Sequence, residues 1–336
     1  MSTSSSLKDK TILVTGGTGS FGKKFVPLTL DKKNPKKIIV FSRDEMKQWT
    51  MAHEFQGDPR LRFFIGDVRD KDRLRRAFED VDVIIHAAAT KIVPTAEYNP
   101  FEAVKTNVLG AMNVVDAALD CGVERVIALS TDKASSPVNL YGATKMVSDK
   151  VFIAANNYVG MKDTRFSVVR YGNVMGSRGS IIPFFMSLKS GQTLPITDPA
   201  MTRFMISLEQ GVELVWTAAE EALGGEIFVR KIPSMNVTDI ARVVRPDLPT
   251  EVVGIRPGEK IHEQMVGPED APFTFDYGDH FRILPSIRIA SHSAASHNGK
   301  LVSPDFAYTS DTNPDWMTDS YLQGWIRENK DLIGSL

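Results

Sequence analysis

One short stretch of the chain, STDKASSPVNLYGATK, carries a dense set of acid–base side chains: Thr131, Asp132, Lys133, Tyr141 and Lys145. Tyr141 and Lys145 are four residues apart, so on a helix they lie on one face. An alcohol oxidation needs only this pair and a hydroxyl group, because the tyrosine takes the substrate proton and the lysine lowers the pKa of the tyrosine. The Asp132–Lys133 pair supplies a further acid and base. The stretch therefore predicts an enzyme that adds a second proton-transfer step to an oxidation.

Catalysis by the Asp132–Lys133 pair requires particular charge states. A lysine is a base only when it is neutral, and an aspartic acid is an acid only when it is protonated. Because the two residues are adjacent, we expect them to titrate as one unit. The alternatives are an ordinary surface ion pair here and a chance Tyr-x-x-x-Lys pair on a helix surface.

A glycine-rich loop follows the short β-branched run Thr11–Thr15. In the sequence GGTGSFG, Gly16, Gly19 and Gly22 form the pattern G-x-x-G-x-x-G, which in a βαβ unit opens a helix and binds a dinucleotide. Without side chains, backbone N–H groups there can approach a pyrophosphate at the helix N-terminus. The loop therefore predicts a dinucleotide site, with an ordinary tight turn as the alternative.

The end of the next apolar run indicates which dinucleotide binds. An acidic residue there favours NAD, and an arginine favours the 2′-phosphate of NADP. Ser42 and Arg43 favour NADP, while Asp44 one residue later keeps NAD as the alternative. Asp67 is expected to meet the adenine, unless it only caps a helix. The segment HAAA leaves room for the cofactor, and its histidine, His86, is expected to lie in the core.

Bulk composition describes an ordinary globular protein. The chain has 336 residues, 42% hydrophobic and 24% charged, with a net charge of -1. No nucleic acid or anionic membrane is therefore expected as a partner, no apolar run is long enough for a membrane span, and a cytoplasmic location is expected. The single cysteine, Cys121, excludes an internal disulfide and is expected to be inert. No metal site is expected.

Continuously apolar runs alternate with helical segments in the first half of the chain, as is typical of a parallel sheet buried on both faces. The runs are Thr11–Thr15, Lys37–Phe41, Leu61–Ile65, Val81–His86, Arg125–Ser130 and Phe166–Arg170. One helix is expected over Glu102–Asp120 and another over Ser207–Ala222, and Asn139 is the expected N-cap of the helix that carries Tyr141. The predicted fold class is α/β: a doubly wound, Rossmann-like parallel sheet with a smaller C-terminal substrate lobe.

The alternation stops after about Tyr171, where glycine, proline and serine become frequent. We predict a dinucleotide-binding domain over residues 1–170, with 204–232 returning to it, and a substrate-binding lobe formed mainly by 171–336. Residues 266–312 are expected to be mostly irregular because prolines interrupt them.

These motifs resemble a known family. TGGTGSFG, YGATK, RYGNVMGSRGS and RPGEK are similar to the extended short-chain dehydrogenase/reductase superfamily. FSRDE, HAAATKIVPTAEYNP, STDKASSPVNLYGATK, LPITDPAMTRF and IRPGEKIHE resemble the inverting UDP-N-acetylglucosamine 4,6-dehydratases of pseudaminic-acid biosynthesis. The resemblance implies a tightly bound, recycled NADP, a UDP-sugar substrate, and a homo-oligomer (a hexamer or dimer) with 105–118 and 146–156 as candidate contact helices.

The resemblance also implies a role for each catalytic candidate. Tyr141, with Thr131, Lys145 and NADP, would oxidise the sugar at C4, which acidifies the C5 proton. Lys133 would remove that proton, and Asp132 would protonate the departing C6 hydroxyl. Hydride would then return to C6 and a proton would reach C5 from the opposite face.

The remaining site residues also rest on the matched motifs, and a nucleotide diphosphate needs cations. The predicted cofactor-binding residues are Gly16, Thr18, Gly19, Ser20, Phe21, Gly22, Ser42, Arg43, Asp44, Lys47, Asp67, Val68, Ala87, Ala88, Ala89, Lys91, Asn107, Tyr141, Lys145 and Val174. The predicted substrate-binding residues are Lys91, Asn173, Arg178, Gly179, Ser180, Thr197, Arg203, Arg256 and Glu259.

Other functions stay open at this point. A retaining 4,6-dehydratase of the larger membrane-attached branch carries methionine in place of Tyr141, and a 4-epimerase has no need of Asp132–Lys133. A non-catalytic NADP-binding sensor or scaffold would be expected to lose Tyr141 or Lys145. Ile92 departs from the family, which has histidine there, and puts the substrate detail or the assembly in question.

Overall fold

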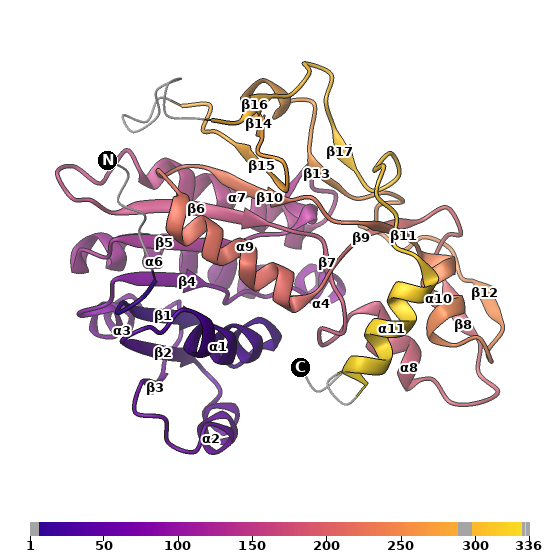
Figure 1. Ribbon diagram of the computed structural model, residues 1–336, viewed down its shortest axis with the longest axis horizontal. Coiled ribbons are helices and arrows are strands. Elements are labelled where there is room, and N and C mark those ends of the chain that lie inside the picture. Colours follow the sequence, from indigo (N-terminus) through magenta and orange to yellow (C-terminus); the bar gives the residue numbers. More distant parts are fainter. Residues whose placement is uncertain (1–6, 288–297, 331–332, 334–336) are drawn as a thin grey trace.

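The computed structural model describes residues 7–287, 298–330 and 333, and within them a ten-stranded sheet forms the centre of the molecule (Figure 1). Its order is β16-β14-β15-β10-β6-β5-β4-β1-β2-β3. The parallel strands are β1 (Thr11–Thr15), β2 (Lys37–Ser42), β3 (Leu61–Ile65), β4 (Val83–His86), β5 (Arg125–Leu129), β6 (Arg165–Arg170) and β10 (Ile227–Arg230). The order places β1 between β2 and β4, so the chain crosses over at β1 and the predicted doubly wound fold is confirmed.

Helices cover both faces of the sheet because successive side chains of each strand point to opposite faces. In β1, Leu13 packs in one apolar cluster while Ile12 and Val14 pack in the other. One face is covered by α3 (Lys71–Phe78), α6 (Gly110–Cys121) and α7 (Leu140–Ala155); the other is covered by α1 (Ser20–Lys32) and α9 (Leu208–Glu221), with α2 (Glu45–Glu54) at the edge. Parallel strands end at one edge of the sheet, so the loops after β1, β4, β5 and β6 lie together.

The expected helix over Glu102–Asp120 lies within a continuous helical run over 100–121, but a π-turn that was not expected interrupts its repeat. The run consists of α5 (Pro100–Val104), the π-helical turn η1 (Lys105–Leu109) and then α6. A π-turn inserts one residue into the helical repeat and is frequent at functional sites. It lets buried Asn107 point at the loop after β4 and at α7, as its hydrogen bonds below show.

Most described residues of 266–312 are irregular, as expected, but short strands lie among them. β13 (Gln264–Val266) ends at the start of this segment, and β14 (Thr274–Asp276), β15 (His280–Ile283), β16 (Lys300–Leu301) and β17 (Tyr308–Thr309) follow. The prolines of this segment lie between strands, where they do not interrupt a ladder. β15, β14 and β16 extend the central sheet antiparallel to β10. Residues 288–297 of this prediction lie outside the described part of the chain.

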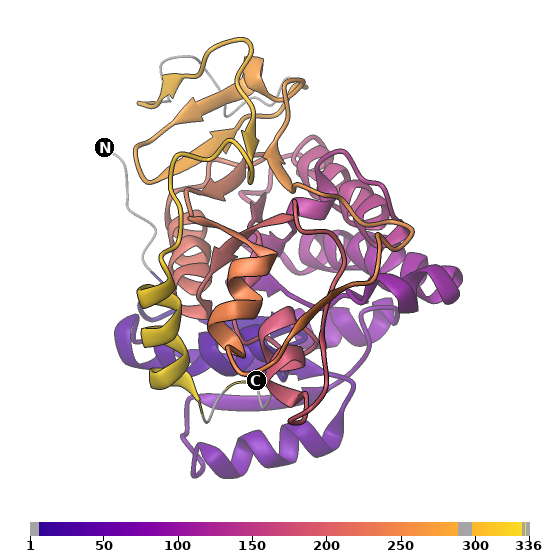
Figure 2. The same cartoon turned by 90° about the vertical axis from the view of Figure 1, so that its right-hand side faces the viewer.

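The smaller lobe packs beside the carboxyl edge of the sheet (Figure 1). Its three-stranded sheet contains β7 (Asn173–Val174), β9 (Thr202–Ile206) and β11 (Ser234–Asn236), and β8 (Leu194–Ile196) pairs with β12 (Thr250–Val252). Helices α8 (Ile181–Ser187), α10 (Val237–Val244) and α11 (Asp319–Asn329) enclose its own apolar core. Figure 2 shows α10 and α11 side by side in this lobe. The division of the chain into two domains at residue 170 stays a prediction.

The return of the chain to the dinucleotide lobe depends on α9. Trp216 on α9 is buried, and its indole N–H donates to the hydroxyl of buried Thr29 on α1 at 3.0 Å. Lys33 at the end of α1 lies over the Trp216 ring and pairs with Glu220 at 2.7 Å. These contacts fix α9 against α1. They also fix the position of β10, which follows α9 in the central sheet.

In the described part of the chain, no helix is long and apolar enough to cross a membrane.

Replacing Thr29 by valine keeps the shape of the side chain but leaves the Trp216 N–H buried without an acceptor. We expect Thr29→Val to lower the free energy of unfolding by about 1–3 kcal/mol, measured by urea denaturation. Thr217→Val, on the exposed side of α9, is the control and should change the stability by no more than about 0.5 kcal/mol. Equal effects of the two substitutions would contradict this account of how α9 is attached.

Candidate active site

The strand β5 and the turn after it position the Asp132–Lys133 pair. Thr131 follows β5, and its hydroxyl accepts from the backbone N–H of Lys133 at 3.3 Å, which starts the short 3-10 turn η2 (Asp132–Ala134). The backbone N–H of Asp132 donates to the carbonyl of Tyr171 at 3.2 Å. Asp132 is fully buried as a result, and the Lys133 side chain is directed to Asp132 and Glu263.

Lys133 lies between two buried carboxylates. Its Nζ is 3.0 Å from Asp132 Oδ1 and 3.1 Å from Glu263 Oε1, on the segment just before β13. Thr131 also donates to Asp132 Oδ1 at 2.9 Å. Burial opposes the ammonium form of Lys133, but the charges of Asp132 and Glu263 outweigh it and raise its pKa. Burial, with the nearby charge of Glu263, raises the pKa of Asp132 against the opposing effect of Lys133.

Glu263 is a site residue that the sequence did not reveal. It is the last residue of the motif IRPGEKIHE, but its distance of 130 positions from Lys133 hides the contact in any local pattern. Burial raises its pKa, and the charges of Lys133 and Arg203 reverse that effect and lower it. The carboxylate is therefore ionised in the pair.

Helix α7 packs against the turn η2, which contains Asp132 and Lys133. Asn139 caps it, as predicted, by accepting from the N–H of Gly142 at 2.7 Å. A Cβ on Gly142 would lie 2.2 Å from the carbonyl oxygen of Lys133, so only glycine allows this close approach. Tyr141 is thereby held beside Thr131 and Lys133. Burial raises the pKa of Tyr141 to about 12, while the Lys133 charge and the hydrogen bond with Thr131 oppose the rise.

The charges around Lys145 differ from the expectation. Lys145 was expected to lower the pKa of Tyr141, but the largest lowering comes from Lys133. Lys145 is buried, which lowers its own pKa, and Asp149 one turn on opposes this effect. Asp149 in turn accepts from the hydroxyl of Ser130 at 2.7 Å. Lys145 is therefore buried within reach of the charge of Asp149, which also pairs with Arg170 at 3.4 Å.

His86 lies in the core at the end of β4, as predicted. Its Nδ1 is 2.8 Å from the hydroxyl of Thr15. Burial, together with the charge of Lys145, lowers the pKa of His86 to about 3. His86 is thus neutral and fills the space under the end of β1.

The glycine loop after β1 fits a dinucleotide. Gly16 has φ +67°, and a Cβ there would lie 2.9 Å from the backbone of Ala88. A Cβ on Gly22 would lie 2.0 Å from the carbonyl oxygen of Gly17, so the first turn of α1 packs onto the loop only because glycine is present. Gly19 caps α1 without a side-chain hydrogen bond, which leaves the helix N-terminus open to a phosphate.

The predicted cofactor residues gather along this edge of the sheet. Thr18, Ser20 and Phe21 lie in the loop and in the first turn of α1, Ala87–Ala89 follow β4, and Val68 and Val174 lie at the loop after β3 and on β7. Asn107 accepts from the backbone N–H of Thr90 at 2.8 Å and donates to the hydroxyl of Thr144 at 2.9 Å. Asn107 therefore ties the loop after β4 to α7.

Arg43 and Asp44, the two charged residues that follow β2, have different surroundings. Asp44 caps α2, where it accepts from the N–H of Lys47 at 3.0 Å and pairs with Lys47 Nζ at 2.8 Å. The Ser42 hydroxyl accepts from Gln48 at 3.2 Å. The Arg43 side chain is 62% exposed and lies 3.6 Å from Asp67, which Arg69 also holds. Asp44 is thus occupied locally, and the Arg43 guanidinium faces solvent.

The predicted substrate residues form two groups. Arg203, on β9, lies 3.9 Å from Glu263 and donates to the backbone carbonyls of Thr202, Ile261 and Lys260. Arg256 and Glu259 pair with each other at 2.5 Å on an exposed loop. The loop of Arg256 and Glu259 contacts the segment between η2 and α7. Asn139 donates to the carbonyl of Gly258 at 2.8 Å, and Lys260 donates to the carbonyl of Ser135 at 2.6 Å.

The loop after β7 reaches the glycine loop. The backbone N–H of Arg178 donates to the Ser20 hydroxyl at 3.4 Å. Surrounding protein atoms and the Arg178 charge lower the pKa of the Lys91 ammonium, so these two cations lie close together. Asn173 Oδ1 and Ser180 Oγ are buried without a hydrogen-bond partner, while Gly179 and Thr197 lie on nearby loops.

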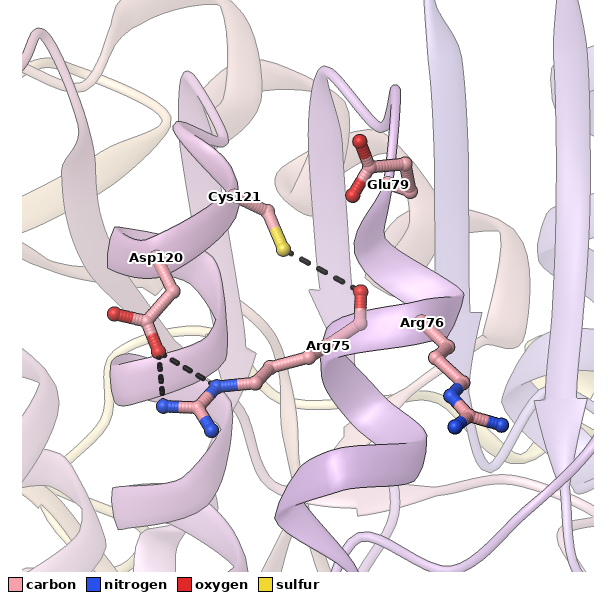
Figure 3. A pocket seen from close by; sticks show the side chains of 5 residues that line it. All are labelled: Arg75, Arg76, Glu79, Asp120 and Cys121. Atoms are coloured by element: carbon pink, nitrogen blue, oxygen red, sulfur yellow. Dashed lines mark hydrogen bonds and ion pairs between the residues drawn. The ribbon is translucent and has the colours of Figure 1, made fainter.

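A separate surface pocket lies between α3 and α6 (Figure 3). It has a volume of about 410 Å³ and is lined by Arg75, Arg76, Glu79, Asp120 and Cys121. Arg75 pairs with Asp120 there, and the Cys121 thiol donates to the carbonyl of Arg75 at 3.4 Å. Burial raises the pKa of this thiol, which keeps it protonated and unreactive. The pocket contains none of the predicted site residues. Over the described residues, no cluster of ligands suits a metal ion.

Comparison with known proteins places this geometry in a family. The family described as polysaccharide biosynthesis protein matches residues 12–285. A UDP-N-acetylglucosamine 4,6-dehydratase (inverting) of Campylobacter jejuni is 54% identical over 321 residues, 93% of this chain and 96% of the relative. A UDP-glucose 4-epimerase of Rickettsia canadensis is 44% identical over 283 residues, 82% of this chain and 83% of the relative. The X-ray structure of Pen from Bacillus thuringiensis has a TM-score of 0.87 and 37% identity, and covers 97% of this chain and 99% of its own.

The neutral, buried His86 predicts a dependence of stability on pH. The pKa of His86 is about 3 in the folded protein and about 6.5 in an unfolded chain. Between these values the unfolded state binds the proton more readily, so stability is lost as the pH falls from 6.5 towards 3, by about 1.4 kcal/mol per pH unit. In His86→Asn, the free energy of unfolding should fall less steeply between pH 7 and pH 5.

Urea denaturation at several pH values measures this slope. His53→Asn, at an exposed position on α2, is the matched control and should keep the slope of the unsubstituted protein. A slope that is unchanged in His86→Asn would show that another group dominates the loss at low pH.

Proposed function

Because this chain belongs to the polysaccharide biosynthesis protein family, we propose that it acts on a nucleotide sugar as an inverting 4,6-dehydratase. The proposed substrate is UDP-N-acetylglucosamine. The proposed product is the UDP-linked 2-acetamido-2,6-dideoxy-4-keto hexose of arabino configuration, a precursor for surface or flagellar glycans. The observation that carries this proposal is the buried contact of Lys133 with Asp132 beside Tyr141.

The Lys133–Asp132 contact meets the charge-state requirement of an elimination. With its two carboxylate neighbours, Lys133 is an ammonium in the free protein. Transfer of one proton from Nζ to Oδ1, across 3.0 Å, makes Lys133 a neutral amine and Asp132 a neutral acid without changing the total charge. The amine then removes the C5 proton, and the acid protonates the C6 hydroxyl, which leaves as water. One contact thus supplies both the base and the acid.

Elimination requires a ketone at C4, because only then is the C5 proton acidic enough. Tyr141 removes the proton of the C4 hydroxyl, and the Lys133 charge and the Thr131 hydrogen bond stabilise the tyrosinate that this requires. NADP, when bound, would supply the redox chemistry that oxidation at C4 and reduction at C6 require. Lys145, within reach of the charge of Asp149, would hold the ribose of the cofactor.

Contacts at the end of β2 favour NADP over NAD. Asp44 is occupied as the cap of α2 and by Lys47, so its carboxylate is not free for a ribose 2′-hydroxyl. Arg43 offers an exposed guanidinium for a 2′-phosphate. NAD remains the alternative. NADP differs from NAD by its 2′-phosphate, which Arg43 would contact.

Substrate binding would rest on the loops of the smaller lobe. Arg203 and Arg256 would neutralise the diphosphate, with Lys91 and Arg178 nearby. Asn173, whose Oδ1 is buried without a partner, would contact the sugar, and Glu259 and Thr197 would lie towards the uridine. Exposed apolar side chains on the predicted contact helices, including Met112 and Val147, would lie between the subunits of a dimer or hexamer in the cytoplasm.

A 4-epimerase is the second candidate, because a relative that is 44% identical carries that name. An epimerase moves a hydride at C4 and leaves the C5 proton in place, so it has no use for a base such as Lys133 beside an acid such as Asp132. The fate of the C5 proton therefore separates the two activities.

The decisive assay follows UDP-N-acetylglucosamine by NMR in heavy water with the pure protein. We expect a 4-keto-6-deoxy sugar that carries deuterium at C5 and has the inverted configuration, because C5 is protonated from solvent on the opposite face. A C4 epimer with its C5 proton retained would identify an epimerase. A deuterated product of unchanged C5 configuration would identify a retaining dehydratase.

Lys133→Ala is the matched control for this assay. It should bind NADP as the unsubstituted protein does, measured by fluorescence titration, while releasing no 4-keto-6-deoxy product. Loss of NADP binding in this variant would show that Lys133 is structural.

A further inference from the structure

Glu263 is a buried, charged group for which the proposed reaction sequence has no step. It is 2% exposed, its Oε1 lies 3.1 Å from Lys133 Nζ, and its Oε2 has no hydrogen-bond partner. An anion so deeply buried is costly unless a nearby cation balances it. The balance comes from Lys133, and more distantly from Arg203 at 3.9 Å.

The backbone around Glu263 is held firmly. Its N–H donates to the hydroxyl of Ser310 at 2.9 Å, and its carbonyl accepts from the N–H of Ser310 at 2.8 Å. The Ser310 hydroxyl also contacts that of Thr202 on β9 at 2.6 Å. These bonds fix the backbone of Glu263 where its carboxylate reaches Lys133, so Lys133 Nζ contacts two oxygens, Asp132 Oδ1 and Glu263 Oε1.

The charges that face this cluster come from four parts of the fold. Asp132 and Lys133 belong to η2, Tyr141 belongs to α7, Arg203 belongs to β9, and Lys260 lies on the same loop as Glu263. Lys260 Nζ is directed away, to the carbonyl of Ser135. The Asp132–Lys133 pair thus has one anionic neighbour, Glu263, and the nearest cation to that anion beyond the pair is Arg203.

An anion at this place acts on both members of the pair in the same direction. It makes a proton harder to remove from Lys133 and easier to add to Asp132. The elimination described above needs the pair to hold one shared proton. The Glu263 anion raises the pKa of both protonation steps of the pair. The pH range in which the pair holds one proton therefore moves to higher pH.

We propose that Glu263 is a positioning residue that holds Lys133 Nζ against Asp132 and retains the single proton that the pair shares. The part played by that proton rests on the proposed dehydratase function, whereas the effect of Glu263 on Lys133 does not. Glu263 touches neither the sugar nor the cofactor in this assignment. It acts through Lys133, and its neighbour Arg203 links it to the side chains expected to bind the diphosphate.

The test compares Glu263→Gln with the unsubstituted protein in two measurements. The first follows the side-chain carbon signal of Lys133 by NMR in protein labelled with carbon-13 lysine, assigned through Lys133→Arg, as the pH is raised without substrate. We expect Lys133 in the unsubstituted protein to remain an ammonium beyond the ordinary lysine value of about 10.4. In Glu263→Gln its titration should move down by about 1–3 pH units.

The second measurement is the pH dependence of kcat/KM for the dehydration. Both limbs of the profile should move to lower pH in Glu263→Gln, whereas a purely structural role would lower kcat/KM equally at every pH. Glu263→Asp should restore the position of the profile, because it restores the charge. An unchanged Lys133 titration, or a uniform loss with unshifted limbs, would overturn the proposal.

Glu226→Gln is the matched control. Glu226 is also a buried glutamate, but it accepts from the N–H groups of Leu223 and Gly224 and from Ser167, away from the catalytic turn. It should lose stability without moving the Lys133 titration. If UDP-N-acetylglucosamine is not dehydrated at all, the proposed function fails, and the NMR titration still decides the role of Glu263.

Discussion

The structure of the site depends on one half-buried ammonium group in contact with two buried carboxylates. Lys133 Nζ lies 3.0 Å from Asp132 and 3.1 Å from Glu263. Removing Lys133 from such an arrangement leaves two unbalanced carboxylates in the interior, which destabilises a protein strongly. The segments that carry these residues are therefore fixed relative to one another. The same arrangement stores a proton where an elimination can use it.

Segments that are far apart in the sequence must meet for this contact to form. Asp132 and Lys133 come from the end of a central strand, whereas Glu263 precedes β13, whose partner strand β17 comes from the C-terminal region. Helix α7 lies on the turn because Gly142 has no side chain, and this brings Tyr141 to the same point. In the proposed reaction, the oxidation and the elimination would therefore share a single lysine: its charge lowers the pKa of Tyr141, and its amine would act at C5.

Local features could be predicted from the sequence, and long-range ones could not. The parallel strands, the glycine loop and the cap at Asn139 are set by neighbouring residues, and the structure confirms them. The π-turn at Lys105–Leu109 could not be predicted, because its five residues have ordinary helical character and tertiary packing decides the register. Glu263 could not be predicted because its partner is distant in sequence. The short strands after 266 were hidden because each has few residues and prolines lie between them.

Neutron diffraction of the deuterium-exchanged, substrate-free protein near neutral pH tests the central claim most directly. The account predicts three deuterons on Lys133 Nζ and none on either carboxylate of Asp132 or Glu263, so that one proton is available for transfer within the pair. A deuteron on Asp132 or Glu263 together with a fully deuterated Lys133 ammonium would contradict it, because the acid and the base would then not be linked by one shared proton.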